Sequence, residues 1–494
     1  MRTAEGRVTT HARPATVAAM SLSVVILAAG LGTRMKSTRA KVLHAVAGRP
    51  QIEYPVGLAR TLGAERVVAV LGHQLDQVKA AIAARFGEGA VHIAVQAEQR
   101  GTGHAVLQAA PLLAGDGLTL ILCGDVPLLT EQTLRTLVET ASQTRTALLT
   151  FRPQSPRGYG RMVRDASGKL VKITEEKDCS DAEREIGEVN AGVYCIPTRF
   201  LVESLGLLRP DNAQGELYLT DVIARAATTM DVQTLECPTE EVMGVNDRID
   251  LAEADRVMRL RICQQHMRAG VTIPVPSSVL VEPGVQLGRD VELGAGVELR
   301  GKTQVGDGTR LDAGVIVTDT IIGAHVHVKP YCVMTESIVS DGAIIGPWAH
   351  LRPGTQLAEN VHLGNFVETK KTRIGKGSKA NHLTYLGDAD IGAGVNVGCG
   401  TITCNYDGFT KSKTIIGDGV FVGSDTQLVA PVQIGRGATI AAGTTVYEDV
   451  EPDALVLTRV KQTTVPGWAA WKRAAEAAKK AGKPVPPRPW RTGK

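Results

Sequence analysis

A glycine-rich segment near the start of the chain combines a flexible backbone with basic side chains. Residues 27–35 read Leu-Ala-Ala-Gly-Leu-Gly-Thr-Arg-Met, and Lys41 follows six residues later. Where such a loop leaves a buried strand, its backbone N–H groups can bind phosphate oxygens. Arg34 and Lys41 would neutralise a triphosphate and the charge that builds on a pyrophosphate leaving group. The segment has no Walker A sequence and lacks the third glycine of the dinucleotide fingerprint, so we predict a different kind of triphosphate site.

Two residues with side-chain oxygens are candidates for a metal site. Asp125 ends an apolar strand, within Cys-Gly-Asp-Val-Pro-Leu at 123–128, and Asn246 offers a second oxygen. An isolated aspartate at the end of a strand is more often a turn or cap residue. Hard cations prefer oxygen ligands, so Gly124 before the aspartate and Asn246 together favour a magnesium site.

The second half of the chain places a histidine among regularly spaced polar residues. His382 begins the segment His-Leu-Thr-Tyr-Leu-Gly-Asp. Imidazole titrates near neutrality and could remove the proton from an amine that attacks a thioester. A lone histidine is more often a corner residue, but Arg352, Lys370, Tyr385 and Asn396 lie on neighbouring repeats. The two basic residues suit a sugar phosphate, and Tyr385 and Asn396 could hold hydroxyl groups or phosphate.

The elements that carry this second group follow a period of six residues. From about residue 281, aliphatic residues recur at every sixth position in four runs, at 287–317, 345–363, 374–386 and 416–446. Neither a helix nor an ordinary strand has this period. It predicts a triangular coil in which each hexad forms one face and its aliphatic residue points inward. The period breaks between Thr403 and Ile416, so we expect residues 404–413 to leave the coil as a loop.

The first half alternates short apolar runs with helical patterns. The runs at 23–29, 66–71, 91–96 and 118–123 predict strands, and 74–85 and 104–113 predict helices between them. This alternation is typical of a mostly parallel, Rossmann-like doubly wound α/β sheet, whose ligands bind beyond the carboxyl ends of the strands. A charged, glycine-poor stretch at 246–269 predicts one long linking helix.

Composition limits the remaining classes of function. The net charge of +4 comes from the termini, because residues 466–494 alone contain eight Lys or Arg and one Glu, so binding to nucleic acid is not indicated. Eight scattered cysteines without a CxxC pair predict a reducing, cytoplasmic compartment, and no stretch is long enough to span a membrane.

We expect residues 1–19 to be a disordered extension and 466–494 a basic disordered tail. Residues 20–245 would then form the α/β domain and 270–465 the coil.

The first half resembles the nucleotidyltransferases that make nucleotide sugars. The resemblance rests on the glycine-rich segment, on Gln-Ala-Glu-Gln-Arg-Gly-Thr-Gly-His-Ala at 96–105, on 123–128, and on Gly-Tyr-Gly-Arg at 158–161. It implies attack by a sugar 1-phosphate on the α-phosphorus of UTP, with Mg²⁺ held by Asp125 and Asn246. The implied binding residues for UTP and the nucleotide sugar are Leu27, Ala28, Ala29, Gly30, Lys41, Gln96, Gly101, Thr102, Cys123, Gly124, Asp125, Gly160, Glu175, Asn190 and Asn246.

The chain from about residue 21 to 459 resembles the bifunctional enzymes that acetylate glucosamine 1-phosphate and then uridylylate the product. The strings at 351–354, 364–371, 382–388 and 401–408 carry this second resemblance. It implies a left-handed parallel β-helix, a homotrimer with the acetyl site between chains, and UDP-N-acetylglucosamine as product. Arg352, Lys370, Tyr385 and Asn396 would bind glucosamine 1-phosphate. The implied acetyl-CoA contacts are Cys399, Asn405, Tyr406, Lys411, Ser424, Ala442 and Arg459, with Lys411 reaching a neighbouring subunit and Cys399 standing where the family usually has alanine.

Three alternatives stay open on the sequence. The coil could be only a regulatory or assembly module attached to a nucleotidyltransferase. It could bind a metal as carbonic anhydrases of this fold do, through His325, His327, His350 or His362, although no three-ligand spacing is evident. The chain could also be a non-catalytic subunit, which would predict damage to the basic and metal-binding residues that are all present here.

Overall fold

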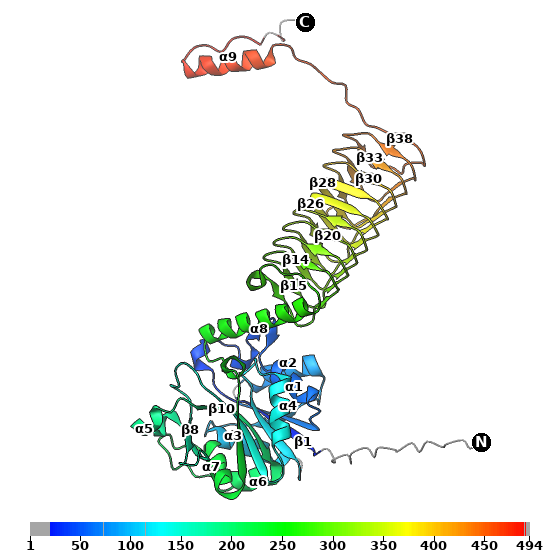
Figure 1. Cartoon of the computed structure of the whole chain (residues 1–494). Helices are drawn as coiled ribbons and strands as arrows, with labels where there is room; N and C mark the ends of the chain where they lie inside the picture. Colours follow the sequence, from blue (N-terminus) through cyan, green and yellow to red (C-terminus); the bar gives the residue numbers. More distant parts are fainter. Residues whose placement is uncertain (1–19, 73, 114, 489, 491–494) are drawn as a thin grey trace, which may run out of the picture. The chain divides into compact units, whose positions relative to one another are not determined.

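The computed structural model describes residues 20–72, 74–113, 115–488 and 490 (Figure 1). The predictions made for residues 1–19 lie outside the described residues. Two compact units form: one runs to Leu287 and includes Leu293–Lys302, and the other comprises Gly288–Glu292 and Thr303–Lys494. The first is the α/β unit and the second contains the coil.

The α/β unit is built on one twisted sheet. Its strands follow the order β11 (Asp231–Glu236), β7 (Arg145–Phe151), β10 (Val189–Pro197), β6 (Leu118–Cys123), β1 (Leu22–Ala28), β4 (Arg66–Leu71) and β5 (His92–Val95). All neighbours are parallel except β10, which runs antiparallel to both β6 and β7. A short ribbon of β8 (Arg161–Arg164) and β9 (Leu170–Thr174) joins it through β10.

Helices cover both faces of this sheet, because its central strands are apolar on both sides. One buried cluster joins β1 to α1 (Glu53–Thr61), α2 (Leu75–Phe86) and α4 (Glu131–Thr140). The other joins it to α3 (Thr102–Ala109), α6 (Thr198–Leu205) and α7 (Thr220–Thr229). The prediction of a doubly wound sheet is therefore confirmed. A single-turn helix, α5 (Asp181–Arg184), follows β9.

One long helix, α8 (Arg248–Arg268), ends the α/β part of this unit. It begins at Asp247, whose carboxylate accepts hydrogen bonds from the backbone N–H groups of Ile249 and Asp250 at 2.8 and 3.0 Å. An N-cap aspartate also interacts favourably with the helix dipole. Four short strands follow in the sequence: β12 (Leu280–Val281), β13 (Gln286–Leu287), β14 (Glu292–Leu293) and β15 (Glu298–Arg300).

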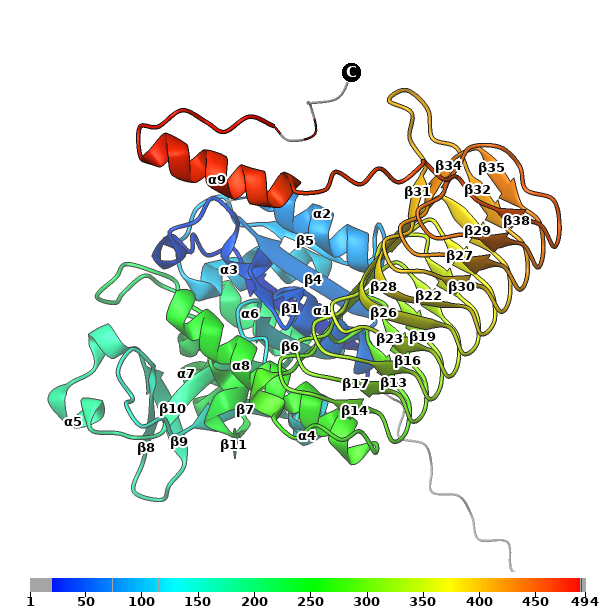
Figure 2. The ribbon, with the colours of Figure 1, turned by 90° about the horizontal axis from the view of Figure 1, so that it is seen from above.

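The coil has three parallel faces, as expected for a left-handed parallel β-helix (Figure 2). The first face contains β17 (Arg310–Leu311), β20 (His327–Val328), β23 (Ile344–Ile345), the starts of β26 (His362–Lys370) and β28 (Lys379–Gly387), β30 (Asn396–Val397), β33 (Phe421–Val422), β36 (Thr439–Ile440) and β38 (Leu455–Val456). The second contains β18 (Ile316–Thr318), β21 (Val333–Thr335), β24 (His350–Leu351), the ends of β26 and β28, β31 (Ile402–Cys404), β34 (Gln427–Val429) and β37 (Thr445–Val446). The third contains β16 (Gln304–Val305), β19 (Ile321–Ile322), β22 (Ile338–Val339), β25 (Gln356–Leu357), β27 (Arg373–Ile374), β29 (Ala389–Ile391), β32 (Thr414–Ile416) and β35 (Val432–Ile434).

The hexad residues point inward, and some coils are one residue shorter than three hexads. Leu311, Leu351 and Leu428 are fully buried, as the period predicts. Between 317 and 345, where no strict six-residue run was found, Ile322, Val328, Met334 and Val339 occupy the core instead. The step into the third face there is five residues, so one corner is turned by one residue fewer.

The predicted excursion is present. The chain leaves the stack after β31 and returns at β32 (Figure 2). An isolated bridge joins Tyr406 to Lys411, and the Asp407 side chain accepts hydrogen bonds from the backbone N–H groups of Phe409 and Thr410 at 2.8 and 2.7 Å. The loop therefore has a defined turn rather than an open form.

The expectation that residues 466–494 are disordered is wrong for part of this segment. Helix α9 (Trp468–Lys480) forms there. Its alanine content favours a helix, and Glu476 pairs with Lys472 one turn away at 3.2 Å. The Trp471 indole N–H donates to the carbonyl oxygen of Pro486 at 2.7 Å, so the proline-rich segment folds back onto the helix. None of the helices within the described residues has the length and apolar character needed to cross a bilayer.

Candidate active sites

A cavity of about 300 Å³ opens at the carboxyl ends of β1, β5 and β6. This is the edge at which doubly wound sheets bind ligands. Ten of the residues predicted to bind the nucleotide line it: Leu27, Ala28, Ala29, Gly30, Lys41, Gln96, Gly101, Thr102, Cys123 and Asp125. Four more, Val42, Gln99, Ala105 and Glu216, complete the lining and were not singled out from the sequence.

The wall of the cavity at Gly101 depends on the absence of a side chain. Gly101 precedes α3 with φ 100° and ψ 172°, a conformation that is essentially restricted to glycine. A Cβ atom there would lie 2.6 Å from the carbonyl oxygen of Leu217. The backbone N–H of Gly103 donates to that same oxygen at 2.8 Å, and the N–H of Leu217 donates to the carbonyl of Arg100 at 2.9 Å. The loop before α3 is therefore held against the loop that carries Glu216.

The predicted basic and metal-binding residues meet at one point. The Lys41 ammonium forms a very short ion pair with the Asp125 carboxylate and lies 3.4 Å from Oδ1 of Asn246. The Arg34 guanidinium donates to the same Asn246 oxygen at 3.0 Å. Residues separated by more than 200 positions thus place two cations and two oxygen ligands around a shared centre.

Cys123 and Gly124 have structural positions beside this centre. The backbone N–H of Gly124 donates to the carbonyl of Leu27 at 2.8 Å, which joins the ends of β6 and β1, but Gly124 itself does not line the cavity. Burial raises the pKa of the Cys123 thiol to about 12, and the nearby Asp125 charge adds to this effect. The thiol therefore stays protonated at neutral pH and is not poised as a nucleophile.

The residues predicted to hold the sugar form an adjoining group. The backbone N–H of Asn190 donates to the carbonyl of Gly160 at 2.9 Å, and a Cβ at Gly160 would lie 3.6 Å from the Glu175 carboxylate. Burial raises the pKa of Glu175, although a hydrogen bond from Thr220 opposes the shift. The Asn190 amide donates to the Tyr194 hydroxyl at 2.6 Å. Gly160, Glu175 and Asn190 do not line the cavity described above. Asn190 lies on β10, Gly160 directly precedes β8, and Glu175 directly follows β9.

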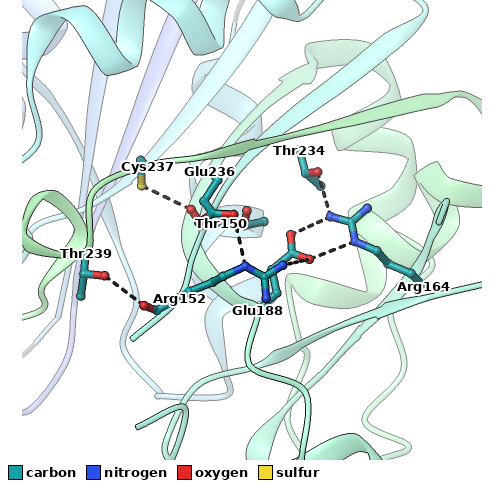
Figure 3. A network of polar contacts seen from close by, with 8 residues as sticks. All are labelled: Thr150, Arg152, Arg164, Glu188, Thr234, Glu236, Cys237 and Thr239. Atoms are coloured by element: carbon teal, nitrogen blue, oxygen red, sulfur yellow. Dashed lines mark hydrogen bonds and ion pairs between the residues drawn. The ribbon is translucent and has the colours of Figure 1, made fainter. Parts of the chain in front are cut away.

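An ion-pair network anchors the start of β10 (Figure 3). The Glu188 carboxylate accepts two hydrogen bonds from the Arg164 guanidinium, at 2.6 and 3.0 Å, and Arg152 lies 3.7 Å from it. Burial alone would raise the pKa of Glu188, but Arg164, then a hydrogen bond from Thr150, and then Arg152 together bring it below its ordinary value. Because Asn190 follows two residues later, this network fixes the strand that carries it.

The second predicted group is assembled by the register of the coil. Residues one coil apart in the stack include Glu368 and Tyr385, Lys370 and Gly387, and Asn365 and His382. Asn396 pairs with Lys379 at the start of β28. His382 lies on the corner between the first and second faces, with Tyr385 and Lys370 on one side and Asn396 on the other.

The orientation of His382 is set by an asparagine on the preceding coil. Its Nδ1 lies 3.1 Å from Oδ1 of Asn365. An amide oxygen can only accept, so Nδ1 carries the proton and Nε2 keeps its lone pair. That tautomer suits a general base, and the exposed ring is open to a substrate.

Positive charge gathers beside the predicted sugar-phosphate residues. Lys411 and then Arg352 lower the pKa of Lys370, because the three cations lie close together. Arg352 also donates to the Glu368 carboxylate at 2.8 Å. Within one chain Lys411 therefore lies near Lys370, and no described contact tests whether it also reaches a neighbouring subunit. A dianionic phosphate would relieve the mutual repulsion of this cluster.

Three of the residues predicted to contact acetyl-CoA lie on successive coils at one corner. A Cβ at Gly398, next to Cys399, would meet the backbone of Ser424, and one at Gly423 would meet Ala442. The carbonyl of Cys399 accepts from the backbone N–H of Asp425 at 2.7 Å, which ties these coils together.

The remaining predicted acetyl-CoA contacts lie beyond that corner. The Asn405 amide donates to the Asp388 carboxylate at 2.5 Å. Tyr406 is exposed on the excursion, and Arg459 follows β38 outside any strand.

The metal alternative for the coil finds no support. Nε2 of His327 lies 2.8 Å from the Asp312 carboxylate, which is an ordinary hydrogen-bond partner for a histidine. Within the described ranges, no three His, Cys, Asp or Glu side chains are grouped so that they could hold a metal ion. Among the polar site residues, sequence reasoning missed the roles of Asn365, Gln99 and Glu216. Asn365 and Gln99 lie within the recognised strings at 364–371 and 96–105, whereas Glu216 belongs to no recognised string.

Comparison with known families gives matches in both units. Residues 24–189 match a family described as MobA-like NTP transferase domain. Residues 271–375 match the GMPPB C-terminal domain, and 413–448 match the bacterial transferase hexapeptide family of six repeats.

Several curated relatives match nearly the whole chain. A protein from Anaeromyxobacter dehalogenans (strain 2CP-C), named bifunctional protein GlmU, is 51% identical over 476 residues, covering 96% of this chain and 97% of the relative. Proteins of the same name from Trichlorobacter lovleyi and Geotalea uraniireducens are 50% and 48% identical. They cover 91% and 92% of this chain, and 98% and 100% of their own lengths.

Proposed function

The chain belongs to the GlmU family of bifunctional proteins, and from that premise we propose which residues perform each of its two reactions. The enzyme makes UDP-N-acetylglucosamine. Its hexapeptide-repeat half acetylates glucosamine 1-phosphate with acetyl-CoA, and its α/β half transfers a uridylyl group from UTP to N-acetylglucosamine 1-phosphate. The coil is therefore catalytic, which sets aside both the assembly-module and the non-catalytic alternatives.

Uridylyl transfer is assigned to the cavity at the ends of β1, β5 and β6. An oxygen of the sugar phosphate attacks the α-phosphorus, a new P–O bond forms, and the bond to the pyrophosphate group breaks. Arg34 and Lys41 neutralise the charge that builds on the leaving group. The convergence of Arg34, Lys41, Asp125 and Asn246 on one point is the observation that carries this assignment.

A metal ion fits the same point. The Asp125 carboxylate and the Asn246 amide oxygen already face one cation there, the Lys41 ammonium. Two protein oxygens are typical of magnesium, which keeps several waters or takes phosphate oxygens for its remaining ligands. Asp125 and Asn246 would hold Mg²⁺, which when bound supplies charge stabilisation to the phosphates. Glu175 and Asn190 would hold the sugar beside it.

Acetyl transfer is assigned to His382 as general base. The substrate amine attacks the thioester carbonyl, a C–N bond forms, and the C–S bond to CoA breaks. Nε2 of His382 takes the amine proton, which then passes to the departing CoA thiolate, while Asn365 holds Nδ1–H. Arg352 and Lys370 bind the phosphate, and Tyr385 and Asn396 bind the hydroxyl groups or phosphate. The acetyl-CoA contacts stay as predicted from the resemblance. All eight cysteines are free, which fits the predicted cytoplasmic, reducing compartment.

We propose that the acetyl site is completed in a homotrimer, and an exposed ladder of apolar side chains supports this. Tyr331, Trp348 and Phe366 stack one coil apart, with ring centroids 5.5 and 5.7 Å apart and planes within 18°. Each is about half exposed, and Leu383 continues the ladder beside His382. All four residues have a positive φ, which costs backbone strain in residues of this size.

The neighbouring coils show that this corner does not require bulky residues. Gly314 and Gly400 occupy it one coil before and one coil after the ladder. A repeated stripe with the pitch of the coil is complementary to another copy of the same coil lying parallel to it. Packing against that copy would bury the ladder and place a second chain next to His382.

Sedimentation velocity of Trp348→Ser tests the trimer. We expect dissociation and loss of acetyl transfer, with uridylyl transfer retained. A wild-type chain that acetylates as a monomer would contradict the trimer and leave the assignment of His382 intact.

Two substitutions test the assignment of the reactions. Asp125→Ala should abolish uridylyl transfer and leave acetyl transfer unchanged, and His382→Ala should do the reverse. Equal loss of both activities in either variant would instead indicate unfolding.

A further inference from the structure

We propose that His104 is a positioning residue that orients the Gln96 amide for recognition of the nucleotide base. The inference rests on the proposed role of Gln96 in binding UTP. Gln96 follows β5, lines the cavity and is only 4% exposed. Its Nε2 lies 3.1 Å from the carbonyl oxygen of Gly101 and 3.1 Å from Nδ1 of His104.

These two contacts fix the direction of the Gln96 amide. The Gly101 oxygen can only accept, so the NH₂ end of Gln96 faces it and donates one hydrogen. The second hydrogen points at His104, whose Nδ1 must therefore accept. A neutral imidazole accepts at only one ring nitrogen, so the His104 proton is on Nε2. In the structure Nε2 of Gln108 lies 3.2 Å from Nε2 of His104 and 3.4 Å from the His104 carbonyl oxygen. With the proton on Nε2 of His104, the Gln108 amide must rotate to present its oxygen to that proton.

The arrangement leaves Oε1 of Gln96 as an unused acceptor. Within the described part of the chain, no donor lies within hydrogen-bond distance of it. A ligand that fills the cavity would bury this acceptor, and a buried acceptor without a partner is costly, so a ligand that offers an N–H group at this point is preferred. Uracil offers N3–H, whereas cytosine has a bare nitrogen at N3 that would repel the oxygen. His104 would thus support the choice of UTP over CTP without touching either.

Comparison of two substitutions at His104 tests the proposal. His104→Leu removes the acceptor, and His104→Asn keeps a polar atom close to the position of Nδ1. The measurement is the ratio of kcat/KM for UTP to kcat/KM for CTP. We expect the ratio to fall about tenfold in His104→Leu, the order of one hydrogen bond, and to stay within about twofold of the wild type in His104→Asn. His104→Phe, which keeps a ring, is the second variant without an acceptor.

A purely structural role for His104 gives a different pattern. Loss of packing would lower both the UTP-to-CTP ratio of kcat/KM and kcat itself, and by the same factor in His104→Asn as in His104→Leu. That result would overturn the proposal. An unchanged ratio in both His104→Leu and His104→Phe would overturn it as well. Acetyl transfer by the same samples reports whether the chain is folded.

Gln96→Leu separates this proposal from the one on which it rests. If that variant keeps the wild-type ratio, the assignment of Gln96 to the base fails. If Gln96→Leu changes the ratio and neither His104→Leu nor His104→Phe does, only the role of His104 fails.

Discussion

Adding one methyl group at Gly101 should damage uridylyl transfer alone. In Gly101→Ala the new Cβ would lie 2.6 Å from the Leu217 oxygen, and the backbone has φ 100° and ψ 172°. The conformation alone costs a non-glycine residue about 1–3 kcal/mol. Relief of the contact must also move Leu217, which is held by backbone hydrogen bonds to Arg100 and Gly103 at 2.9 and 2.8 Å.

A total of at least about 2 kcal/mol lost from the site lowers kcat/KM for UTP by about 30-fold. The assay is pyrophosphate release from UTP and N-acetylglucosamine 1-phosphate, with acetyl transfer measured on the same sample. Gly57→Ala is the matched control, because a Cβ at Gly57 meets nothing within 4 Å. Wild-type kcat/KM in Gly101→Ala would refute the claim that the close approach of these two loops shapes the nucleotide site.

Three further perturbations have defined outcomes. The lowered pKa of Glu188 means that its ion pair stabilises the fold above the ordinary carboxyl pKa and is lost as pH falls through the folded value. Glu188→Gln should therefore lower the melting temperature at pH 7, and the difference from wild type should shrink as the pH falls below the ordinary carboxyl pKa; a difference that stays constant as the pH falls would count against the network. Leu351→Ala removes a fully buried side chain and should cost about 2–5 kcal/mol, seen as a lower denaturation midpoint for the coil, whereas an unchanged midpoint would contradict inward packing of the hexads. Arg352→Ala should raise KM for glucosamine 1-phosphate and leave KM for acetyl-CoA unchanged; the opposite pattern would remove Arg352 from the phosphate site.

Much of the fold follows from local patterns. Strands β4 and β6 have the bounds that their apolar runs predict, since a strand buried on both faces reads as a continuous apolar segment. The antiparallel course of β10 was not predicted, because its sequence pattern carries no direction. In the coil, the repeat between 317 and 345 was not detected from the sequence. The step from Val317 to Ile322 is five residues, and a search for a strict period of six misses a corner that is one residue shorter.

Some residues of the candidate sites could also be predicted from the sequence, and others could not. Strings such as the one at 27–35 identify residues by type and spacing, and the structure brings Arg34, Lys41 and Asn246 together as those strings require. Asn365 and His104 were missed because each acts through a neighbouring side chain, and such pairing depends on register that no single segment encodes. The prediction of disorder for residues 466–494 relied on the prolines at its end. It overlooked the alanine-rich helix α9 that precedes them, and Trp471 of this helix holds the proline-rich segment.

The most direct test of two separate active sites is a mixing experiment. Asp125→Ala and His382→Ala are each supplied with glucosamine 1-phosphate, acetyl-CoA, UTP and magnesium, and UDP-N-acetylglucosamine is measured by mass spectrometry. We predict no product from either variant alone and product from the mixture, because the acetylated intermediate made by Asp125→Ala can be uridylylated by His382→Ala. Product from His382→Ala alone, or none from the mixture of folded variants, would contradict the account.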